Sequence, residues 1–131
     1  SNLVPVMNSV SSIALEQSDI ISFHHYGPEN DLAIIINGLQ QYQRPLICTE
    51  WLARSEGSTV DNLQIFSDQK VGAINWGLVD GKTQTRFPWR SWWEKVDEDE
   101  PWFHELLYAD GTPYSEQEAN TFRRITTKNF Q

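Results

Sequence analysis

The sequence is poor in four features that would otherwise point to a function: cysteine, basic residues, long apolar runs and glycine-rich loops. A single cysteine, Cys48, among 131 residues excludes an internal disulfide and a zinc site built from cysteines. The 10 Lys and Arg against 18 Asp and Glu give a net charge of −8, so we expect no nucleic-acid partner. Because no apolar run approaches the roughly 18–20 residues that span a bilayer, we also expect no membrane segment.

Aromatic residues are abundant by contrast. The chain has 6 Trp, 4 Tyr and 6 Phe, within an overall composition of 39% hydrophobic and 21% charged residues that is ordinary for one globular domain. About half of these rings are expected in the core. The tryptophans follow predicted strand ends or lie in polar loops: Trp51, Trp76, Trp89, Trp92, Trp93 and Trp102. Because flat indole faces in a cleft can stack on the apolar faces of sugar rings, a neutral carbohydrate is a candidate ligand.

Hydrophobic periodicity predicts alternating helices and strands. Helices are predicted over residues 5–17, 31–42 and 115–125, and from a cap at Thr59 to about Phe66. Strands are predicted over 19–26, within 44–51 and over 71–77, and a hairpin-like turn over 109–113. The long stretch between Asp80 and Pro101 has no clear period, and loops of that length inside a compact domain are usually functional or disordered.

This alternation predicts an α/β fold with a parallel sheet and right-handed crossovers. Two architectures fit: a small doubly wound sheet, or part of a (β/α)8 barrel. No glycine-rich phosphate loop follows any predicted strand, which disfavours a nucleotide-binding fold. A complete barrel needs about 250 residues and eight βα units. If the fold is a barrel, residues 1–131 are therefore a single segment from its carboxyl-terminal part.

The three predicted strands end in polar or aromatic side chains. The apolar run before Glu50 has the continuous pattern of a parallel strand covered on both faces. His24 and Tyr26 share one face of the first strand, because side chains alternate. Asn75 and Trp76 end the third strand, and His24, Glu50 and Trp76 are evenly spaced in the sequence. Because active sites of parallel α/β folds lie at the carboxyl ends of strands, Glu50 is a candidate catalytic carboxylate.

Several of these motifs resemble a known family. They are His24-x-Tyr26, Thr49-Glu50-Trp51, Asn75-Trp76-Gly77, residues 77–85 with Pro88-Trp89, Trp102-Phe103-His104, and residues 110–114. In this order the motifs resemble strands six to eight, and the stretches that follow, of the retaining glycoside hydrolases with a (β/α)8 barrel. That group is the cellulase, mannanase and xylanase-like clan, and the likeness to the loop after strand eight is to its bacterial members. The resemblance covers residues from about Asp19 to Ile125.

The resemblance implies a polysaccharide or oligosaccharide substrate and a role for each matched residue. Glu50 matches the nucleophile that forms a covalent glycosyl-enzyme intermediate. His24 and Tyr26 match the residues that position this nucleophile and the sugar, and Trp76 matches an aromatic platform. Trp51, Asn75 and Trp89 are the further candidates for substrate binding. No cofactor is implied, and we expect no metal site, because His24, His25 and His104 lack the spacing of metal ligands.

The resemblance is incomplete in one important respect. In this clan the acid/base is a Glu that follows an Asn at the end of strand four, and the chain has no Asn-Glu dipeptide. We therefore expect the segment alone to be inactive, with the acid/base on a strand upstream of Ser1. Three strands from a barrel also leave two unpaired edges, so we expect either self-association through these edges or a longer parent chain.

Two other interpretations remain open from the residues. The first is a non-catalytic carbohydrate-binding module, which would explain the tryptophans and the missing acid/base. Such modules are mostly β-sandwiches, whereas residues 32–39 and 119–125 have helical periodicity. The second is a small α/β binding protein, which would explain the topology and leave the aromatic strand ends unexplained.

Overall fold

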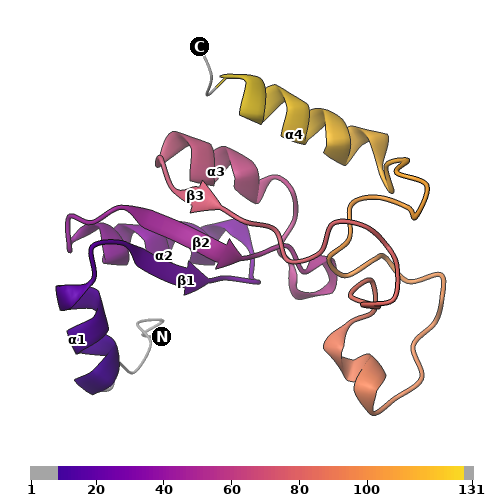
Figure 1. Ribbon diagram of the computed structural model, residues 1–131, viewed down its shortest axis with the longest axis horizontal. Coiled ribbons are helices and arrows are strands. Elements are labelled where there is room, and N and C mark those ends of the chain that lie inside the picture. Colours follow the sequence, from indigo (N-terminus) through magenta and orange to yellow (C-terminus); the bar gives the residue numbers. More distant parts are fainter. Residues whose placement is uncertain (1–8, 129–131) are drawn as a thin grey trace.

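The computed structural model describes residues 9–128 (Figure 1). Its elements are α1 (Ser9–Gln17), β1 (Ile21–His24), α2 (Glu29–Gln40), β2 (Leu46–Glu50), the 3-10 helix η1 (Arg54–Glu56), α3 (Asn62–Asp68), β3 (Gly72–Ala73), the 3-10 helix η2 (Trp89–Trp92) and α4 (Glu116–Lys128). This order confirms the predicted alternation of helices and strands. The predicted start of the first helix, residues 5–8, lies outside the described residues.

The strands form one parallel sheet in the order β1-β2-β3. In its register Ile21 lies opposite Leu46 and His24 lies opposite Glu50. The α/β class and the parallel βα units are therefore confirmed, in a small three-stranded sheet. The register also brings His24 and Glu50 side by side, as their equal positions at successive strand ends predicted.

The third strand is much shorter than predicted. Regular pairing stops at Ala73, after which the Ile74 amide still donates to the Cys48 carbonyl at 2.8 Å. Val79 then pairs with Leu107 instead of with β2. Gly77 has a left-handed φ of 115°, and a Cβ there would lie 3.0 Å from the Cβ of His104. A close crossing with residues 104–107 thus draws the chain out of the sheet before Asn75 and Trp76.

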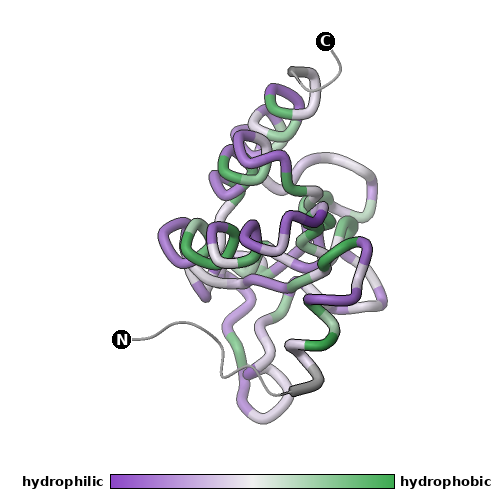
Figure 2. Tube along the Cα trace, turned by 90° about the vertical axis from the view of Figure 1, so that its left-hand side faces the viewer, coloured by the Kyte–Doolittle hydropathy of each residue, from purple (hydrophilic) through white to green (hydrophobic). Residues whose placement is uncertain are grey.

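One hydrophobic core joins one face of the sheet to the helices. Its buried members include Ile21, Leu32, Ile36, Leu46, Cys48, Leu63, Phe66, Val71 and Ile125. In Figure 1, α2 lies behind the sheet and α4 lies above α3, and Figure 2 shows hydrophobic and hydrophilic residues recurring along the helices. Burial alternates along β2: Leu46 and Cys48 are buried, whereas Ile47 and Thr49 are only partly covered. The prediction of a strand covered on both faces is therefore met only in part, because within the described residues one face of β2 is buried and the other is partly covered.

The carboxyl ends of the strands face the long loop. In Figure 1 the arrowheads point toward the side of the molecule that holds residues 80–101 and η2. The predicted turn at 109–113 is present, with the Tyr108 amide donating to the Thr112 carbonyl at 2.8 Å. None of the helices within residues 9–128 has the length and apolar character required to cross a bilayer.

Arg54 joins the loop after β2 to the carboxyl-terminal third of the chain. Its Nε and Nη2 donate to the two carboxylate oxygens of Glu118 on α4, at 3.0 and 2.6 Å. Nη1 donates to the Trp102 carbonyl at 2.7 Å and Nη2 to the Glu105 carbonyl at 3.1 Å. The guanidinium also lies over the Tyr114 ring, 4.9 Å from its centroid. Both charged groups are largely buried, so the fork of N–H donors satisfies acceptors that water does not reach.

We expect Arg54→Ala to lower the free energy of unfolding by about 3–5 kcal/mol, because it leaves the Glu118 carboxylate buried without its partner. Arg54→Lys should recover less than half of this loss, since an ammonium cannot reproduce the fork geometry. The matched control is Arg123→Ala, which breaks an exposed pair with Glu116 on the same helix and should cost about 1 kcal/mol or less. Urea unfolding measures the free energy of unfolding of the three variants. Equal losses for Arg54→Ala and Arg123→Ala would contradict the structural role of the buried Arg54–Glu118 pair.

We also expect the sheet edge to promote self-association. The segment after β3 exposes Ile74 and Leu78, and an open edge with apolar side chains pairs readily with another chain. Sedimentation velocity should show concentration-dependent association at micromolar protein. A charge at the edge, Ile74→Lys, should reduce it, whereas Ile34→Lys on the exposed face of α2 should not. A monomer at all concentrations would rule this out.

Candidate active site

Glu50 lies at the carboxyl end of β2 between two polar side chains from β1 and the residues that follow it. The Tyr26 hydroxyl donates a hydrogen bond to Glu50 Oε2, and His24 Nδ1 lies 3.2 Å from the same oxygen. The His25 amide donates to the Glu50 carbonyl at 3.0 Å, which extends the parallel pairing past the strand end. The expected grouping of an imidazole, a phenol and a carboxylate at one edge of the sheet is therefore present.

Both contacts fall on one carboxylate oxygen. Within the described residues, Oε2 accepts from Tyr26 and contacts His24, while Oε1 has neither partner. The hydrogen bond from Tyr26 restricts the rotamer of the carboxylate and leaves Oε1 outside both of these contacts. The side chain is only partly covered. Glu50 can thus act as a nucleophile or base through Oε1.

The surroundings of Tyr26 keep it a hydrogen-bond donor. Burial, and then the hydrogen bond and negative charge of Glu50, raise the pKa of Tyr26 well above its ordinary value. The phenol therefore stays protonated at neutral pH. Its ring meets the Trp89 indole edge-to-face, with centroids 5.0 Å apart, and Trp89 meets Phe103 in the same way at 4.9 Å. Here we name Glu50, His24, Tyr26 and Trp89 the Glu50 rim.

His104 packs against the Tyr26 and Trp89 rings of the Glu50 rim. Sequence reasoning did not assign this residue to the site. Its ring lies 5.5 Å from that of Tyr26 and 6.1 Å from that of Trp89. Nδ1 donates to the Leu52 carbonyl at 2.5 Å, which assigns the proton to this nitrogen. Burial lowers the pKa of His104, so the imidazole is neutral at pH 7. Its position in the run Trp102-Phe103-His104 was the sequence signal, but only the fold brings it to Tyr26.

The backbone separates Glu50 from its neighbour Trp51. Leu52 has a left-handed φ of 68°, which is uncommon for a bulky residue, and its amide donates to Ser58 Oγ at 3.2 Å. Trp51 turns into the core, is 1% exposed and packs against Phe66 at 5.4 Å. This corrects the expectation that Trp51 binds substrate: its indole is covered by α3 and cannot stack on a ligand.

Asn75 and Trp76 lie away from the positions that a regular strand would have given them. Asn75 Nδ2 donates to the carbonyls of Gly77 and His104, so this amide stabilises the crossing; Oδ1 is buried and has no partner within residues 9–128. Trp76 is 47% exposed, but the described ring contacts do not join it to Tyr26 or Trp89. The structure brings His24, Tyr26 and Trp89 to Glu50 and does not bring Trp51, Asn75 or Trp76 into the same set of contacts.

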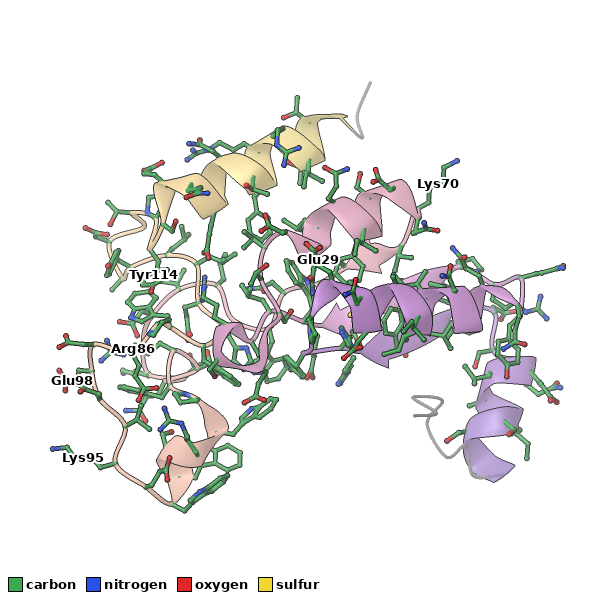
Figure 3. All side chains as sticks on the ribbon, turned by 180° about the vertical axis from the view of Figure 1, so that it is seen from behind. Glu29, Lys70, Arg86, Lys95, Glu98 and Tyr114 are labelled. Carbon is green, nitrogen blue, oxygen red and sulfur yellow. The ribbon has the colours of Figure 1, made fainter. Side chains whose placement is uncertain are left out.

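Two further carboxylates near the crossing are engaged elsewhere. Asp80 lies 3.5 Å from Arg86 Nε, and Figure 3 shows Arg86 in the loop region near Tyr114. Glu105 is 0% exposed: its Oε1 accepts from the Thr85 hydroxyl, while Oε2 has no partner among the described residues. Burial is the main cause that raises the pKa of Glu105, and the charge of Asp80 adds to it, against the effects of Thr85 and Arg54.

No family model, curated protein or solved structure matches this chain. Within residues 9–128, no group of three or more His, Cys, Asp or Glu is arranged to hold a metal ion.

The burial of Glu105 predicts a pH-dependent stability. A raised pKa means that the folded state binds the proton more tightly than the unfolded state does. The contribution of Glu105 to the free energy of unfolding is therefore greatest below its ordinary pKa of about 4.3, and it is lost as the pH rises through the pKa of Glu105 in the folded state. Glu105→Gln carries no charge to bury and should stabilise the protein by about 1–3 kcal/mol near pH 8. The gain should vanish near pH 4.

Thermal or urea unfolding between pH 4 and 8 measures this difference. Glu98→Gln, in the exposed acidic run, is the matched control and should have no comparable pH dependence. A Glu105→Gln effect that is constant with pH would show that folding does not raise the pKa of Glu105.

Proposed function

We propose that this chain is the carboxyl-terminal part of the (β/α)8 barrel of a retaining glycoside hydrolase, with Glu50 as the nucleophile. The observation that supports it most is the placement of one carboxylate at the carboxyl end of the middle strand of a parallel sheet, with Tyr26 and His24 both on Oε2. An oriented, partly exposed carboxylate with one free oxygen is the arrangement that covalent catalysis on a sugar requires.

In the proposed reaction, Glu50 Oε1 attacks the anomeric carbon of a β-glycoside. The new ester C–O bond forms as the bond to the leaving oxygen breaks, and a second carboxyl group delivers a proton to that oxygen. Water, deprotonated by the same second group, then displaces Glu50 and returns the sugar with its original anomeric configuration. Tyr26 stays protonated throughout and orients Oε2, while His24 is on the solvent side of the same oxygen.

The second carboxyl is the part that the described residues do not supply. Retention needs it about 5–5.5 Å from the nucleophile. Asp80 is paired with Arg86, and Glu105 is buried behind Thr85. The proposal therefore assigns the acid/base to a strand outside the chain, and the chain alone should not turn over substrate.

The rival carbohydrate-binding function loses its main structural basis. Most such modules are β-sandwiches, whereas residues 9–128 combine a parallel sheet with four α-helices. A small α/β binding protein remains compatible with the fold, but it assigns no role to the contacts of Tyr26 and His24 with one oxygen of Glu50.

The test uses the chain alone and the chain extended by the coding sequence that precedes Ser1, with aryl β-cellobioside, β-mannobioside and β-xylobioside as substrates. The extended protein should hydrolyse one of them, and Glu50→Gln should lower kcat/KM by roughly 10⁴-fold, the scale expected when a covalent nucleophile is removed. In Glu50→Ala, added azide should attack the anomeric carbon in place of the carboxylate and give a glycosyl azide of inverted configuration.

Asp80→Asn is the control for a carboxylate outside the rim and should retain most of the activity. Hydrolysis by the extended protein that survives Glu50→Gln would reject the proposed nucleophile. Glu50-dependent turnover by the 131-residue chain alone would instead contradict the proposal that the acid/base lies outside these residues.

A further inference from the structure

His104 is a buried imidazole in contact with the Glu50 rim. Its side chain is almost completely covered, and its ring packs against Phe103 with centroids 4.3 Å apart and against Tyr26 at 5.5 Å. The Tyr26 hydroxyl donates to Glu50 Oε2. Tyr26 is therefore held between two partners, with its ring against His104 and its hydroxyl group against Glu50.

A second contact joins His104 to the turn that follows Glu50. Nδ1 of the imidazole donates to the carbonyl of Leu52, two residues beyond Glu50. Leu52 is buried in a left-handed conformation that costs free energy for a bulky residue, and without this donor its carbonyl would lose its partner. His104 thus reaches Glu50 by two routes, through the Tyr26 ring and through the backbone.

The segment that carries His104 is itself fixed. The Phe103 amide donates to the Arg86 carbonyl at 2.7 Å, and the His104 carbonyl accepts from Asn75 Nδ2 at 3.4 Å. The chain also passes so close to Gly77 that a Cβ there would lie 3.0 Å from the Cβ of His104. A side chain that orients its neighbours needs this kind of support from the residues around it.

The protonation state of His104 suits a role in orientation. Burial lowers its pKa and the charge of Arg54 adds to this effect, whereas the hydrogen bond to Leu52 and the charge of Glu50 raise the pKa. The net effect is a lowered pKa, so the ring is uncharged at neutral pH, with its proton shared with the Leu52 carbonyl. It therefore places no positive charge beside Glu50.

We propose that His104 is a positioning residue for Glu50. Its ring holds the Tyr26 phenol against Glu50 Oε2, and its Nδ1 proton holds the turn that follows Glu50. The role concerns the geometry of the carboxylate, and only its effect on catalysis rests on the proposed function. His104 acts through Tyr26 and Leu52 and does not touch the substrate.

The test labels the 131-residue chain with tyrosine that carries ¹³C at Cζ, and the Tyr26 resonance is assigned by its loss in Tyr26→Phe. Glu50→Ala removes the acceptor and gives the position of this resonance without the hydrogen bond. His104→Asn keeps a donor for Leu52 and removes the ring, whereas His104→Phe keeps a ring and removes the donor. Each should move the Tyr26 resonance by about a third or more of the displacement seen in Glu50→Ala, since each removes one of the two contacts.

The matched control is Phe66→Leu, which changes the core packing against Trp51 and should leave the Tyr26 resonance in place. A folded His104 variant whose Tyr26 resonance does not move would overturn the proposal. The ¹⁵N shifts of the unchanged chain provide a measurement that does not depend on the folding of the variants. They should show a neutral His104 with its proton on Nδ1 at pH 7, and a proton on Nε2 alone would overturn the proposal as well.

Activity separates this role from the proposed function. In the chain extended upstream of Ser1, His104→Asn should lower kcat by roughly tenfold to a hundredfold, the cost of a misplaced group, with little change in KM. An effect of His104→Asn on KM alone would contradict the positioning role. If hydrolysis survives Glu50→Gln, the proposed function fails, and the Tyr26 resonance still decides whether His104 orients Glu50.

Discussion

The buried guanidinium of Arg54 is the interaction on which the rest of the structure depends. It follows the strand that carries Glu50, and it donates four hydrogen bonds, two to a carboxylate on α4 and two to the carbonyls of Trp102 and Glu105. The Arg54 amide adds a bond to the Phe103 carbonyl at 3.2 Å. Since Phe103 in turn packs on Trp89, the aromatic part of the Glu50 rim is connected to Arg54 through its backbone as well as its side chain.

The turn after β2 places two neighbouring residues in different environments, Glu50 in the rim and Trp51 in the core. Adjacent side chains of a strand point in opposite directions, so Glu50 can meet the rim while Trp51 enters the core. The left-handed Leu52 then redirects the chain, and Ser58 and His104 bind its amide and carbonyl. A backbone conformation of this kind costs free energy, and the two hydrogen bonds offset it.

The Glu50 rim combines two kinds of structure. Glu50 is on a strand, where the sheet fixes its direction, whereas Trp89 is on a short helix of the long loop, which ion pairs of Arg90 join to Glu94 and Glu100. The net charge of −8 is compatible with the proposed substrate, because a neutral glycan is not repelled by it. The crossing of residues 77 and 104 also ends β3 early, which leaves the sheet edge open beside the rim.

The sequence by itself determined the α/β order, the parallel strands and the meeting of His24, Tyr26 and Glu50, because these follow from local periodicity and from strand ends that share one edge of a sheet. It could not determine where β3 stops, nor that Trp51 is covered while Trp92 and Trp93 are not, since one apolar residue type serves both core and surface. Arg54, His104 and Glu105 were also outside its reach. Their partners lie far along the chain, and contacts between such distant residues depend on how the helices and the long loop pack, which only the tertiary structure decided.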